Sequence, residues 1–491
     1  MSLDARPTIL CCDLGGSSLR VGLIGVDGAI GPLASVPLTV AADAEGRSEV
    51  DPVEWWDGFL SAARTVARAD AVAFRSIVGV AICGMTRTQV LVDANGVPVR
   101  PAITFRDTRS GDVASEIARE TGLAGIDAFH PMARLAYVAR HEPERFAHAA
   151  HVLDPKDYLA LRLSGVAASD PISFARLAEL EGSAVPVFAE CLKRLPILMR
   201  PGTKLGAVQV GLPEPFEGLA ETPVFMASND TWAAVVGLGA MQPGCAYNVS
   251  GTSEVLGVIG TRAASAEGLM TVDWNNGLFQ LGGPSQTGAD VFGWLQTMLG
   301  PQTTNLAAVA DDTPANPRPL IFLPFLQGER VPHWNPDLRA AFIGLDRSHQ
   351  PHDLVRAVLE GFAFANRDVL TRAEQAIGIA ANEIRIGGGG ARNASWCQIK
   401  ADICQRPVVT TGSDEPGLLG CAAVALTGLG RYPSLAAAQQ HLVRPGKAYL
   451  PREQHRLRYD ALFEVYRRAV SAVMDLSADL AAVPRPVNLS R

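Results

Sequence analysis

Several features that would assign the chain to a specialised class are missing from its sequence. No apolar run approaches the roughly 18 residues that a membrane span requires, and the opening MSLDARP contains no signal-peptide core. A net charge of −7 provides no basic surface for nucleic acid. The eight cysteines form no C-x-x-C pair and several lie in apolar runs, as in proteins of reducing compartments. We therefore expect a cytoplasmic protein with neither membrane nor nucleic-acid partner.

The length of the chain predicts two domains. Its 491 residues exceed what one hydrophobic core normally serves. No Pro- or Ser-rich linker separates two halves, so only the residue pattern indicates the boundary. We expect one domain over residues 1–244, a second over 245–480, and a disordered tail over 481–491.

The alternation of strands and helices predicts an α/β fold with mixed sheets. Thr8–Leu14 and Arg20–Val26 read as two strands around a Gly-Gly-Ser-Ser turn, and Asp27-Gly28 predicts a further hairpin. A P-loop would need a helix after the glycines, so this turn is of another kind. Trp55–Ala69 reads as a helix, and Ser76–Ile82 as a buried strand.

The second half of the sequence repeats the opening pattern. Tyr247–Val249 and Val255–Ile259 again enclose a hydroxyl-rich glycine turn, which suggests two related domains that face a cleft. Asp353–Asp368 predicts a helix with Asp353 as its N-cap. Glu383–Ile386 predicts a strand that runs into four glycines.

Asp13, with the turn that follows it, is the first candidate site. Gly15 and Gly16 let backbone N–H groups approach phosphate oxygens, and Ser17 and Ser18 add hydroxyl donors. The Asp13 carboxylate beside them suits Mg²⁺, through water. The alternative is a tight hairpin in which Asp13 only caps the turn.

Gly251-Thr252-Ser253 is a second turn of this kind in the other half. Two such hairpins around a triphosphate would supply the positioning and charge neutralisation that phosphoryl transfer requires. Asp230 is the candidate base, because a carboxylate can accept the proton of an attacking hydroxyl. Either Asp230 or Asn229 could instead cap the helix that follows.

The four glycines Gly387 to Gly390 form the last candidate segment. They would allow close approach of a flat adenine, with Asn393 supplying an amide. A flexible loop is the alternative.

These motifs together resemble the FGGY family of carbohydrate kinases over nearly the whole chain. The C-terminal signature of the family fits Ala340 to Glu360: AAFIGL, seven residues, then DLVRAVLE. DLGGSSLR resembles its first phosphate motif, with Gly16 in place of the usual threonine, and SGTSE resembles the second. GGGGARNASWCQIKADICQRPV resembles its adenosine segment. In the N-terminal signature, Arg134 and Tyr137 stand where Lys and Trp are usual.

The resemblance implies two ribonuclease-H-like domains of the actin–hexokinase–Hsp70 superfamily, with an interdomain cleft that closes over ATP and substrate. It implies Asp230 as the general base, and Mg²⁺ held by Asp13 with Asp230. The residues it assigns to ATP are Gly15, Gly16, Ser17, Ser18, Arg20, Gly251, Thr252, Ser253, Gly288, Gly388, Gly389 and Asn393.

Two segments resemble the sugar-facing parts of the family. CGMTRTQVLVD carries Met85-Thr86-Arg87 where xylulokinases have Gln-Met-His and glycerol kinases Gln-Arg-Glu. Phe105 to Arg109 resembles the W-N-D-T-R segment of xylulokinases. The resemblance thus implies that the acceptor meets Thr86, Arg87, Asp107, Asn229 and Asp230, although Arg87 could equally be a structural ion-pair residue.

The leading hypothesis is ATP-dependent phosphorylation of a small sugar, a ketopentose such as xylulose. Thr86-Arg87 matches the motif of neither xylulokinases nor glycerol kinases. The alternative acceptors are therefore glycerol, erythritol, ribulose, fuculose or a signalling sugar. A nucleotide-gated binding protein of the same superfamily is the alternative from another class, although it could dispense with Asp230. A homodimer is an option that the sequence leaves open.

Overall fold

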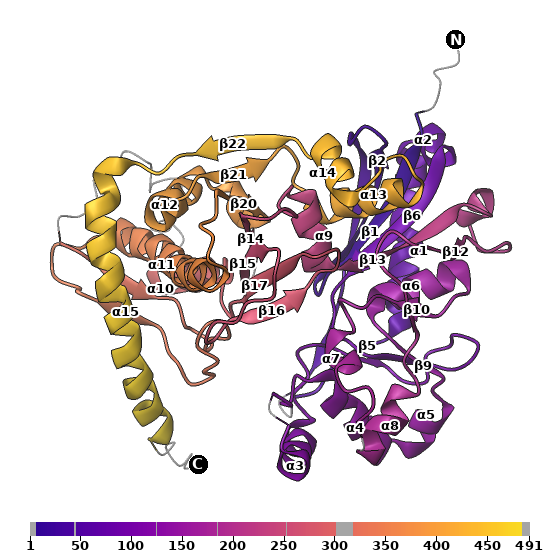
Figure 1. The fold of residues 1–491 in the computed structure, drawn as a ribbon, viewed down its shortest axis with the longest axis horizontal. Coiled ribbons are helices and arrows are strands. Elements are labelled where there is room, and N and C mark those ends of the chain that lie inside the picture. Colours follow the sequence, from indigo (N-terminus) through magenta and orange to yellow (C-terminus); the bar gives the residue numbers. More distant parts are fainter. Residues whose placement is uncertain are drawn as a thin grey trace. The chain divides into compact units, whose positions relative to one another are not determined.

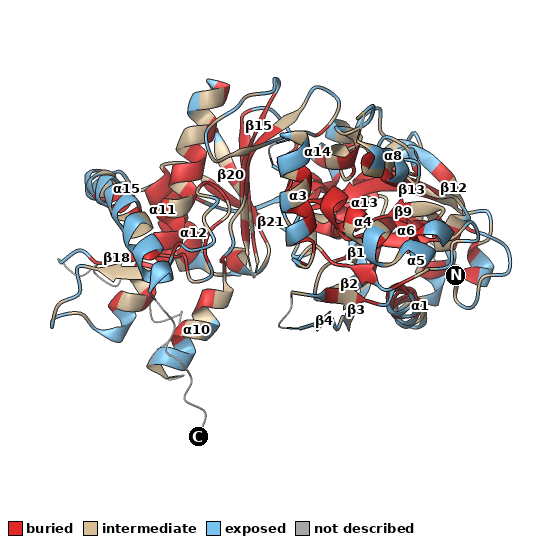
Figure 2. Cartoon of the chain, turned by 90° about the horizontal axis from the view of Figure 1, so that it is seen from below, coloured by how far each residue is buried: buried red, intermediate tan, exposed pale blue. Residues whose placement is uncertain are grey.

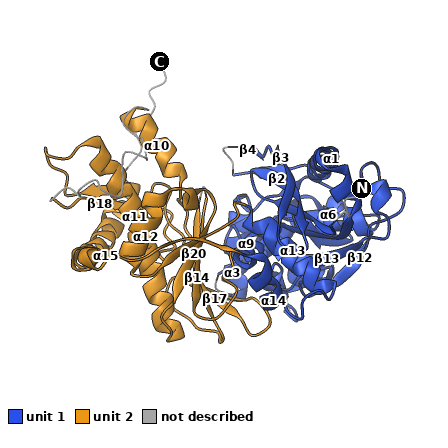
Figure 3. Cartoon of the chain, turned by 90° about the horizontal axis from the view of Figure 1, so that it is seen from above, with its two compact units in different colours: residues 1–237, 415–443 blue, residues 238–414, 444–491 orange. Residues whose placement is uncertain are grey.

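The computed structural model describes residues 6–43, 46–123, 125–183, 185–251, 253–300 and 318–483. The chain forms two compact units, coloured separately in Figure 3. Unit 1 comprises residues 1–237 and 415–443, and unit 2 comprises residues 238–414 and 444–491.

The division differs from the expected one mainly in the path of the chain near its C-terminal part. The chain leaves unit 1 after Gly237, close to the predicted break, but α13 (Pro416–Gly428) and α14 (Leu435–Leu442) return to unit 1. Added Cβ atoms would lie 1.8 Å from the Pro416 carbonyl oxygen at Gly237 and 2.0 Å from the Ala233 carbonyl oxygen at Gly420. The small residues therefore let α13 pack closely on the helix that ends at Gly237.

A six-stranded mixed sheet forms the centre of unit 1 (Figure 1). Its order is β12–β13–β6–β1–β2–β3, with β1 antiparallel to β2 and parallel to β6. The strands are β1 (Thr8–Leu14), β2 (Ser18–Gly25), β3 (Ile30–Pro37), β6 (Ile77–Gly84), β12 (Lys204–Ala207) and β13 (Pro223–Asn229).

Helices cover both faces of β1, which explains its almost continuous apolar sequence. Leu10, Cys12 and Leu14 join the core that includes helix α1 (Pro52–Ala69). Asp13 points to the other face, because a Cβ at Gly417 of α13 would lie 2.4 Å from its Oδ2 atom.

Helix α1 begins three residues before the predicted start at Trp55. Asp51 caps it by accepting a hydrogen bond from the Val53 N–H at 3.0 Å, and Pro52 occupies the first turn. The helix turns an apolar stripe that includes Trp55 and Phe59 toward the sheet.

Shorter elements complete unit 1. The helices are α2 (Ala71–Arg75), α3 (Gly111–Thr121), α4 (Pro131–His141), α5 (Pro143–His148), α6 (Pro155–Ser164), α7 (Ala175–Ala178), α8 (Pro186–Leu192), η1 (Phe216–Leu219) and α9 (Asp230–Gly237). The short strands are β4 (Ala41–Ala42), β5 (Ser48–Val50), β7 (Val90–Val92), β8 (Ala102–Ile103), β9 (His151–Leu153), β10 (Ala168–Ser169) and β11 (Ile197–Leu198).

Unit 2 contains a seven-stranded mixed sheet in the order β16–β17–β15–β14–β20–β21–β22. The strands are β14 (Cys245–Ser250), β15 (Glu254–Gly260), β16 (Met270–Asp273), β17 (Phe279–Pro284), β20 (Glu383–Gly387), β21 (Val408–Thr411) and β22 (Pro445–Tyr449). The other elements are α10 (Asp290–Leu299), β18 (Ile321–Leu323), β19 (Ala341–Ile343), α11 (Pro351–Ile377), η3 (Gly389–Arg392), α12 (Ala394–Cys404) and α15 (Glu453–Ala482).

The two sheets confirm the predicted repeat. In unit 1, the antiparallel set β3–β2–β1 continues with β6 and β13, both parallel, and with antiparallel β12. In unit 2, β17–β15–β14 continues with parallel β20 and β21 and with antiparallel β22. The same sequence of pairings in both units supports a shared ancestry of the two halves.

Helix α11 is longer than predicted, and its central residues are buried (Figure 2). The N-cap is Gln350, while Asp353 lies in the first turn and accepts a hydrogen bond from the Gln350 N–H at 2.8 Å. Gly378 ends the helix with a φ of 78°. The prediction of Asp353 as the N-cap was wrong because Asp353 is the second member of a capping box.

The predicted tail starts inside α15, since residues 481 and 482 are helical. Residues 484–491 lie outside the described part of the chain. Among the described residues, no helix has the length and apolarity needed to cross a membrane.

Candidate active site

The turn between β1 and β2 is closed by a hydrogen bond from the Gly15 N–H to the Ser18 carbonyl at 3.0 Å. Ser17 lies exposed within the turn. A Cβ on Gly16 would lie 3.3 Å from Phe105 Cε1, which favours glycine where the motif usually has threonine. The turn therefore combines accessible backbone with hydroxyl side chains, as a phosphate-binding turn requires.

Asp13 precedes this turn and has an unusual acidity. Burial and, after it, the negative charge of Asp230 raise the pKa of its carboxyl to about 7, while the charge of Arg20 opposes the shift. Arg20 itself is half-exposed and pairs with Glu415 at 3.6 Å. Asp13 and Asp230 are therefore close enough to repel each other within unit 1.

Asn229, and not Asp230, caps helix α9. Its Oδ1 atom accepts a hydrogen bond from the Trp232 N–H at 2.9 Å. Asp230 Oδ1 accepts from the Thr231 N–H at 2.6 Å, and burial raises the pKa of Asp230. Among the described residues, Asp230 Oδ2 has no hydrogen-bond donor. One carboxylate oxygen thus stays available at the end of β13.

The carboxylates of Asp13 and Asp230 fit a magnesium ion whose other ligands are water and substrate phosphates. The described residues contain no group of three or more His, Cys, Asp or Glu side chains that could hold a metal. Mg²⁺ in kinases commonly uses one or two carboxylates together with water and substrate phosphates. Asp13 and Asp230 meet that need, because a cation near both would relieve their mutual repulsion.

A buried charge network supports the strand end that carries Asp230. Lys156 Nζ lies 2.5 Å from Asp157 Oδ1 and 2.8 Å from Asp170 Oδ2, and all three side chains are at most 1% exposed. Asp170 Oδ1 accepts a hydrogen bond from Ser228 Oγ at 2.7 Å. Burial alone would lower the pKa of Lys156, but the surrounding carboxylates raise it. The network is therefore anchored to Ser228, which lies two residues before Asp230 in the sequence.

The segment Met85-Thr86-Arg87 follows β6. Thr86 Oγ1 donates to Asp154 Oδ2 at 2.9 Å. Arg87 has a φ of 59°, in the left-handed region that residues other than glycine rarely adopt. Its carbonyl accepts a hydrogen bond from Arg134 Nη1 at 2.6 Å. Thr86 and Arg87, which are predicted to face the acceptor, thus lie in a turn whose backbone is strained at Arg87 and held by hydrogen bonds to Asp154 and Arg134.

Asp107 is fully buried, with its carboxylate engaged inside the protein. Arg109 Nη2 donates to Oδ2 at 2.6 Å, and the Ser48 N–H donates to the same oxygen at 2.7 Å. Arg109 Nε and the Arg109 N–H also approach the carboxylate. The position of Asp107 in this structure is that of a support for its loop, and its predicted contact with the acceptor stays a prediction.

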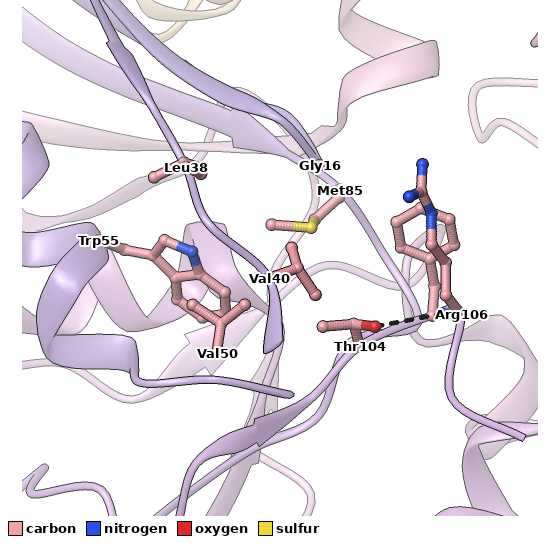
Figure 4. Close-up of a pocket in the computed structure, with 9 residues that line it drawn as sticks. Gly16, Leu38, Val40, Val50, Trp55, Met85, Thr104 and Arg106 are labelled. Carbon is pink, nitrogen blue, oxygen red and sulfur yellow. Dashed lines mark hydrogen bonds between the residues drawn. The ribbon is translucent and has the colours of Figure 1, made fainter. Parts of the chain in front are cut away.

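A small cavity lies beside the first turn (Figure 4). The lining consists of Gly16, Leu38, Val40, Val50, Trp55, Met85, Thr104, Phe105 and Arg106. Thr104 Oγ1 accepts the Arg106 N–H at 3.3 Å, the dashed line in Figure 4. A cavity of about 10 Å³ has room for about one water molecule. The turn predicted to bind phosphate and both segments predicted to face the sugar thus contribute to one cavity of unit 1.

In unit 2, the second turn predicted to bind phosphate joins β14 to β15. The Gly251 N–H donates to the Ser253 carbonyl at 3.0 Å, and Thr252 lies outside the described residues. The Gly251 carbonyl accepts the Ala289 N–H at 2.9 Å, which joins this turn to the segment of Gly288. Two predicted nucleotide segments are therefore in direct contact.

A second buried ion pair supports this turn. Lys400 Nζ lies 2.5 Å from Glu254 Oε1 and 2.5 Å from Asn248 Oδ1. Glu254 also accepts Ser250 Oγ at 2.6 Å and Asn366 Nδ2 at 2.9 Å. Ser250 and Glu254 flank the turn, so the network fixes its two ends.

The four-glycine segment packs against the same strand. Gly388 has a φ of 82°, and a Cβ there would lie 2.5 Å from the Ser250 carbonyl oxygen. Gly389 has nothing within 4 Å of such a Cβ, which leaves open space above it. Asn393 Oδ1 caps α12 by accepting the Trp396 N–H at 2.9 Å. Gly388 is thus required by packing, and Gly389 borders free space.

Glu329 holds the segment around Gly288. Its carboxylate accepts Ser285 Oγ at 2.8 Å and the Gln286 N–H at 2.6 Å, while the Gly288 N–H donates to Asp290 Oδ1 at 3.1 Å. Burial raises the pKa of Glu329 to about 7. Glu329 therefore positions this turn from a distant part of the sequence.

The structure groups the predicted residues by unit. Unit 1 contains those around Asp13, Arg87 and Asp230, and unit 2 contains those around Gly251 and Gly388. Sequence reasoning missed five supporting residues: Arg134, Lys156, Glu254, Glu329 and Lys400. Their roles depend on partners elsewhere in the sequence, such as Asp170 for Lys156 and Glu254 for Lys400, which the sequence alone does not reveal.

The comparisons with known proteins cover both units. The description "FGGY family of carbohydrate kinases, N-terminal domain" matches residues 8–237, and the C-terminal domain of that family matches residues 246–429. The boundary between the two matches agrees with the end of α9 at Gly237.

Individual relatives match nearly the full chain. Xylulose kinase of Escherichia coli (strain K12) is 31% identical over 95% of this chain and 99% of its own length. Glycerol kinase of Citrifermentans bemidjiense is 29% identical over 91% of this chain and 95% of its own length. The crystal structure of xylulose kinase from Rhodospirillum rubrum superposes with a TM-score of 0.85 at 26% identity, over 96% of this chain and 100% of that one.

Proposed function

Because the chain belongs to the FGGY family of carbohydrate kinases, we propose that it transfers the γ-phosphoryl group of ATP to a ketopentose such as xylulose. Membership makes the protein a sugar-phosphorylating kinase with the two-domain fold of that family, and ATP is the substrate that a kinase of this family implies. The choice of ketopentose is supported by the relatives named xylulose kinase at up to 31% identity.

Asp230 is the general base of the proposed reaction. The observation that supports this role is the capping of α9 by Asn229, which leaves Asp230 Oδ2 available at the end of β13. A carboxylate with a raised pKa accepts the proton of an attacking hydroxyl more readily than an ordinary aspartate does. The hydroxyl oxygen then forms the bond to phosphorus as the bond to ADP breaks.

The remaining residues bind and orient the two substrates. Asp13 and Asp230 would hold Mg²⁺, which neutralises charge on the transferred phosphoryl group when bound. Thr86 and Arg87 would contact the acceptor. The residues proposed to bind ATP are Gly15, Gly16, Ser17, Ser18, Arg20, Gly251, Thr252, Ser253, Gly288, Gly388, Gly389 and Asn393.

A coupled ADP-release assay with a panel of ketoses and polyols tests the acceptor. We expect the highest kcat/KM with a ketopentose. Glycerol is the second candidate, because the turn Met85-Thr86-Arg87 differs from that of xylulokinases and a glycerol kinase is 29% identical. A panel in which no sugar or polyol stimulates ATP turnover would contradict both.

The variant Asp230→Asn tests the base. We expect kcat to fall by about 10²–10⁴-fold, with ATP affinity by calorimetry nearly unchanged. Asp70→Asn, at the half-buried N-cap of α2, is the matched control and should keep full activity. Near-normal turnover in Asp230→Asn would remove Asp230 from this role.

A further inference from the structure

Arg134 of helix α4 is fully buried, and it binds only backbone. Its Nη1 atom donates to the Arg87 carbonyl at 2.6 Å, and Nη2 donates to the Phe105 carbonyl at 2.9 Å. Nε and Nη2 both reach the Asp107 carbonyl at 3.3 Å. Within the described part of the chain, this guanidinium forms no ion pair with a carboxylate. Three carbonyl groups therefore satisfy one buried cation.

The three carbonyls belong to two separate segments. Arg87 lies in the turn after β6, whereas Phe105 and Asp107 lie in the loop after β8. Both segments are those proposed to face the acceptor, and both contribute to the cavity of Figure 4 through Met85 and Phe105. A single rigid guanidinium thus sets the spacing between the two.

Arg134 also supports a strained backbone conformation. A left-handed φ such as the 59° of Arg87 is unfavourable for a residue with a Cβ atom, so the surrounding contacts must maintain it. The neighbouring hydroxyls are anchored as well: Thr86 donates to Asp154, and Thr88 Oγ1 accepts the Phe105 N–H at 3.1 Å. The carbonyl of Arg87 is oriented by Arg134.

The anchor of Arg134 is itself well defined. His130 caps α4 because its Nδ1 atom accepts a hydrogen bond from the Met132 N–H at 3.1 Å. The cap holds the start of the helix that carries Arg134. Burial and, after it, the charges of nearby arginines lower the pKa of His130 to about 3, so its ring is neutral and can accept. Burial also lowers the pKa of Arg134, to about 10, which leaves it charged at neutral pH.

We propose that Arg134 is a positioning residue that sets acceptor recognition by fixing the turn of Arg87 against the loop of Phe105 to Asp107. This inference rests on the proposed function, since it requires those two segments to face the acceptor. Arginine suits the task because its planar fork carries donors in three directions, while a lysine offers one nitrogen. The family signature usually has lysine at this position. In this chain, arginine with its larger set of donors occurs together with the unusual Thr86-Arg87 turn.

Two variants of Arg134 test the proposal. For Arg134→Met, we expect the acceptor KM to rise by at least about tenfold, because several charged hydrogen bonds are lost. The KM for ATP should stay within twofold, since Arg134 donates to none of the residues proposed to bind ATP. Arg134→Lys keeps the charge and should show a smaller rise in acceptor KM, together with an altered ratio of kcat/KM between ketopentoses and polyols.

Arg194→Met is the matched control in the same unit. Arg194 likewise donates to three carbonyls, those of Phe146 at 3.2 Å, Ala149 at 3.0 Å and Glu190 at 2.6 Å, none of them in the two segments. We expect this variant to lower the melting temperature while acceptor and ATP KM values stay at those of the wild type.

The outcomes separate the two proposals. If Arg134→Met is insoluble, Arg134→Lys decides, and an unchanged acceptor KM and unchanged acceptor ratio overturn the inference. Equal rises in the KM for acceptor and for ATP also overturn it, because they indicate general loosening. A wild-type enzyme that no sugar or polyol stimulates would overturn the proposed function, and the inference with it.

Discussion

Removal of the Lys400 ammonium group should reveal how strongly the buried ion pair of unit 2 stabilises the fold. Lys400 and Glu254 are each 2% exposed, and Nζ lies 2.5 Å from Oε1. Lys400→Met retains most of the side-chain volume. It leaves the Glu254 carboxylate buried without a cation, next to the phosphate turn that Ser250 and Glu254 flank.

The loss of unfolding free energy in Lys400→Met depends on the hydrogen bonds that Glu254 keeps. Removing one member of a buried ion pair costs about 3–5 kcal/mol of unfolding free energy. Glu254 keeps hydrogen bonds from Ser250 at 2.6 Å and Asn366 at 2.9 Å, so we expect the lower end, about 3 kcal/mol. The double variant Lys400→Met/Glu254→Gln buries no charge, and it should recover at least about 1.5 kcal/mol relative to the sum of the single variants.

Urea unfolding followed by tryptophan fluorescence measures the change, because Lys400 Nζ lies 4.3 Å from the Trp396 ring centroid. Arg467→Met is the control in the same unit: its pair with Glu464 at 3.8 Å is more than half exposed, and its removal should cost at most about 0.5 kcal/mol. A Lys400→Met variant as stable as Arg467→Met, or a double variant that shows the full sum, would refute the reasoning.

Two further predictions concern unit 2. The folded-state pKa of Glu329, about 7, exceeds the ordinary value of 4.5, so the folded state binds more protons between these pH values and the unfolding free energy should fall as pH rises through them. Glu329→Gln should remove a fall of about 3 kcal/mol between pH 5 and pH 8 in urea titrations, and superimposable profiles would contradict this. Gly388→Ala should destabilise unit 2 by about 1–3 kcal/mol and raise the KM for ATP, because of its left-handed φ and the contact with Ser250. Gly389→Ala, with open space around its Cβ, should keep wild-type stability in the same melts; equal losses would be evidence against the packing argument.

The sequence predicts the parts of the fold that local patterns encode. The hairpin of β1 and β2 begins and ends within two residues of its prediction, because an apolar run, a glycine turn and Asp27-Gly28 leave few alternatives. The repeated hairpin at β14 and β15 follows by the same reasoning. The return of α13 to unit 1 could not be predicted, because a helix that is apolar nearly all round does not show which sheet it covers.

The candidate site likewise contains residues that a local pattern indicates and residues whose roles depend on distant partners. Asp13, Asp230 and the glycine turns were visible because their chemistry and their position after strands coincide. The roles of Lys156 and Arg134 depend on partners at distant positions in the sequence, such as Asp170 and Phe105. For Asp107 the motif suggests an acceptor contact, which stays a prediction, and the fold adds that Arg109 and Ser48 hold its carboxylate.

The late return of α13 has a consequence for synthesis on the ribosome. Strand β1 is synthesised about 400 residues before the helix that covers the face of Asp13. After Gly237 has left the peptidyl-transferase centre, roughly 180 residues of unit 2 are translated before Glu415. At typical rates of elongation this interval lasts about 10–35 s. During that time the face of the nascent sheet that α13 covers lacks this helix, so unit 1 becomes a complete folding unit only after most of unit 2 has been synthesised.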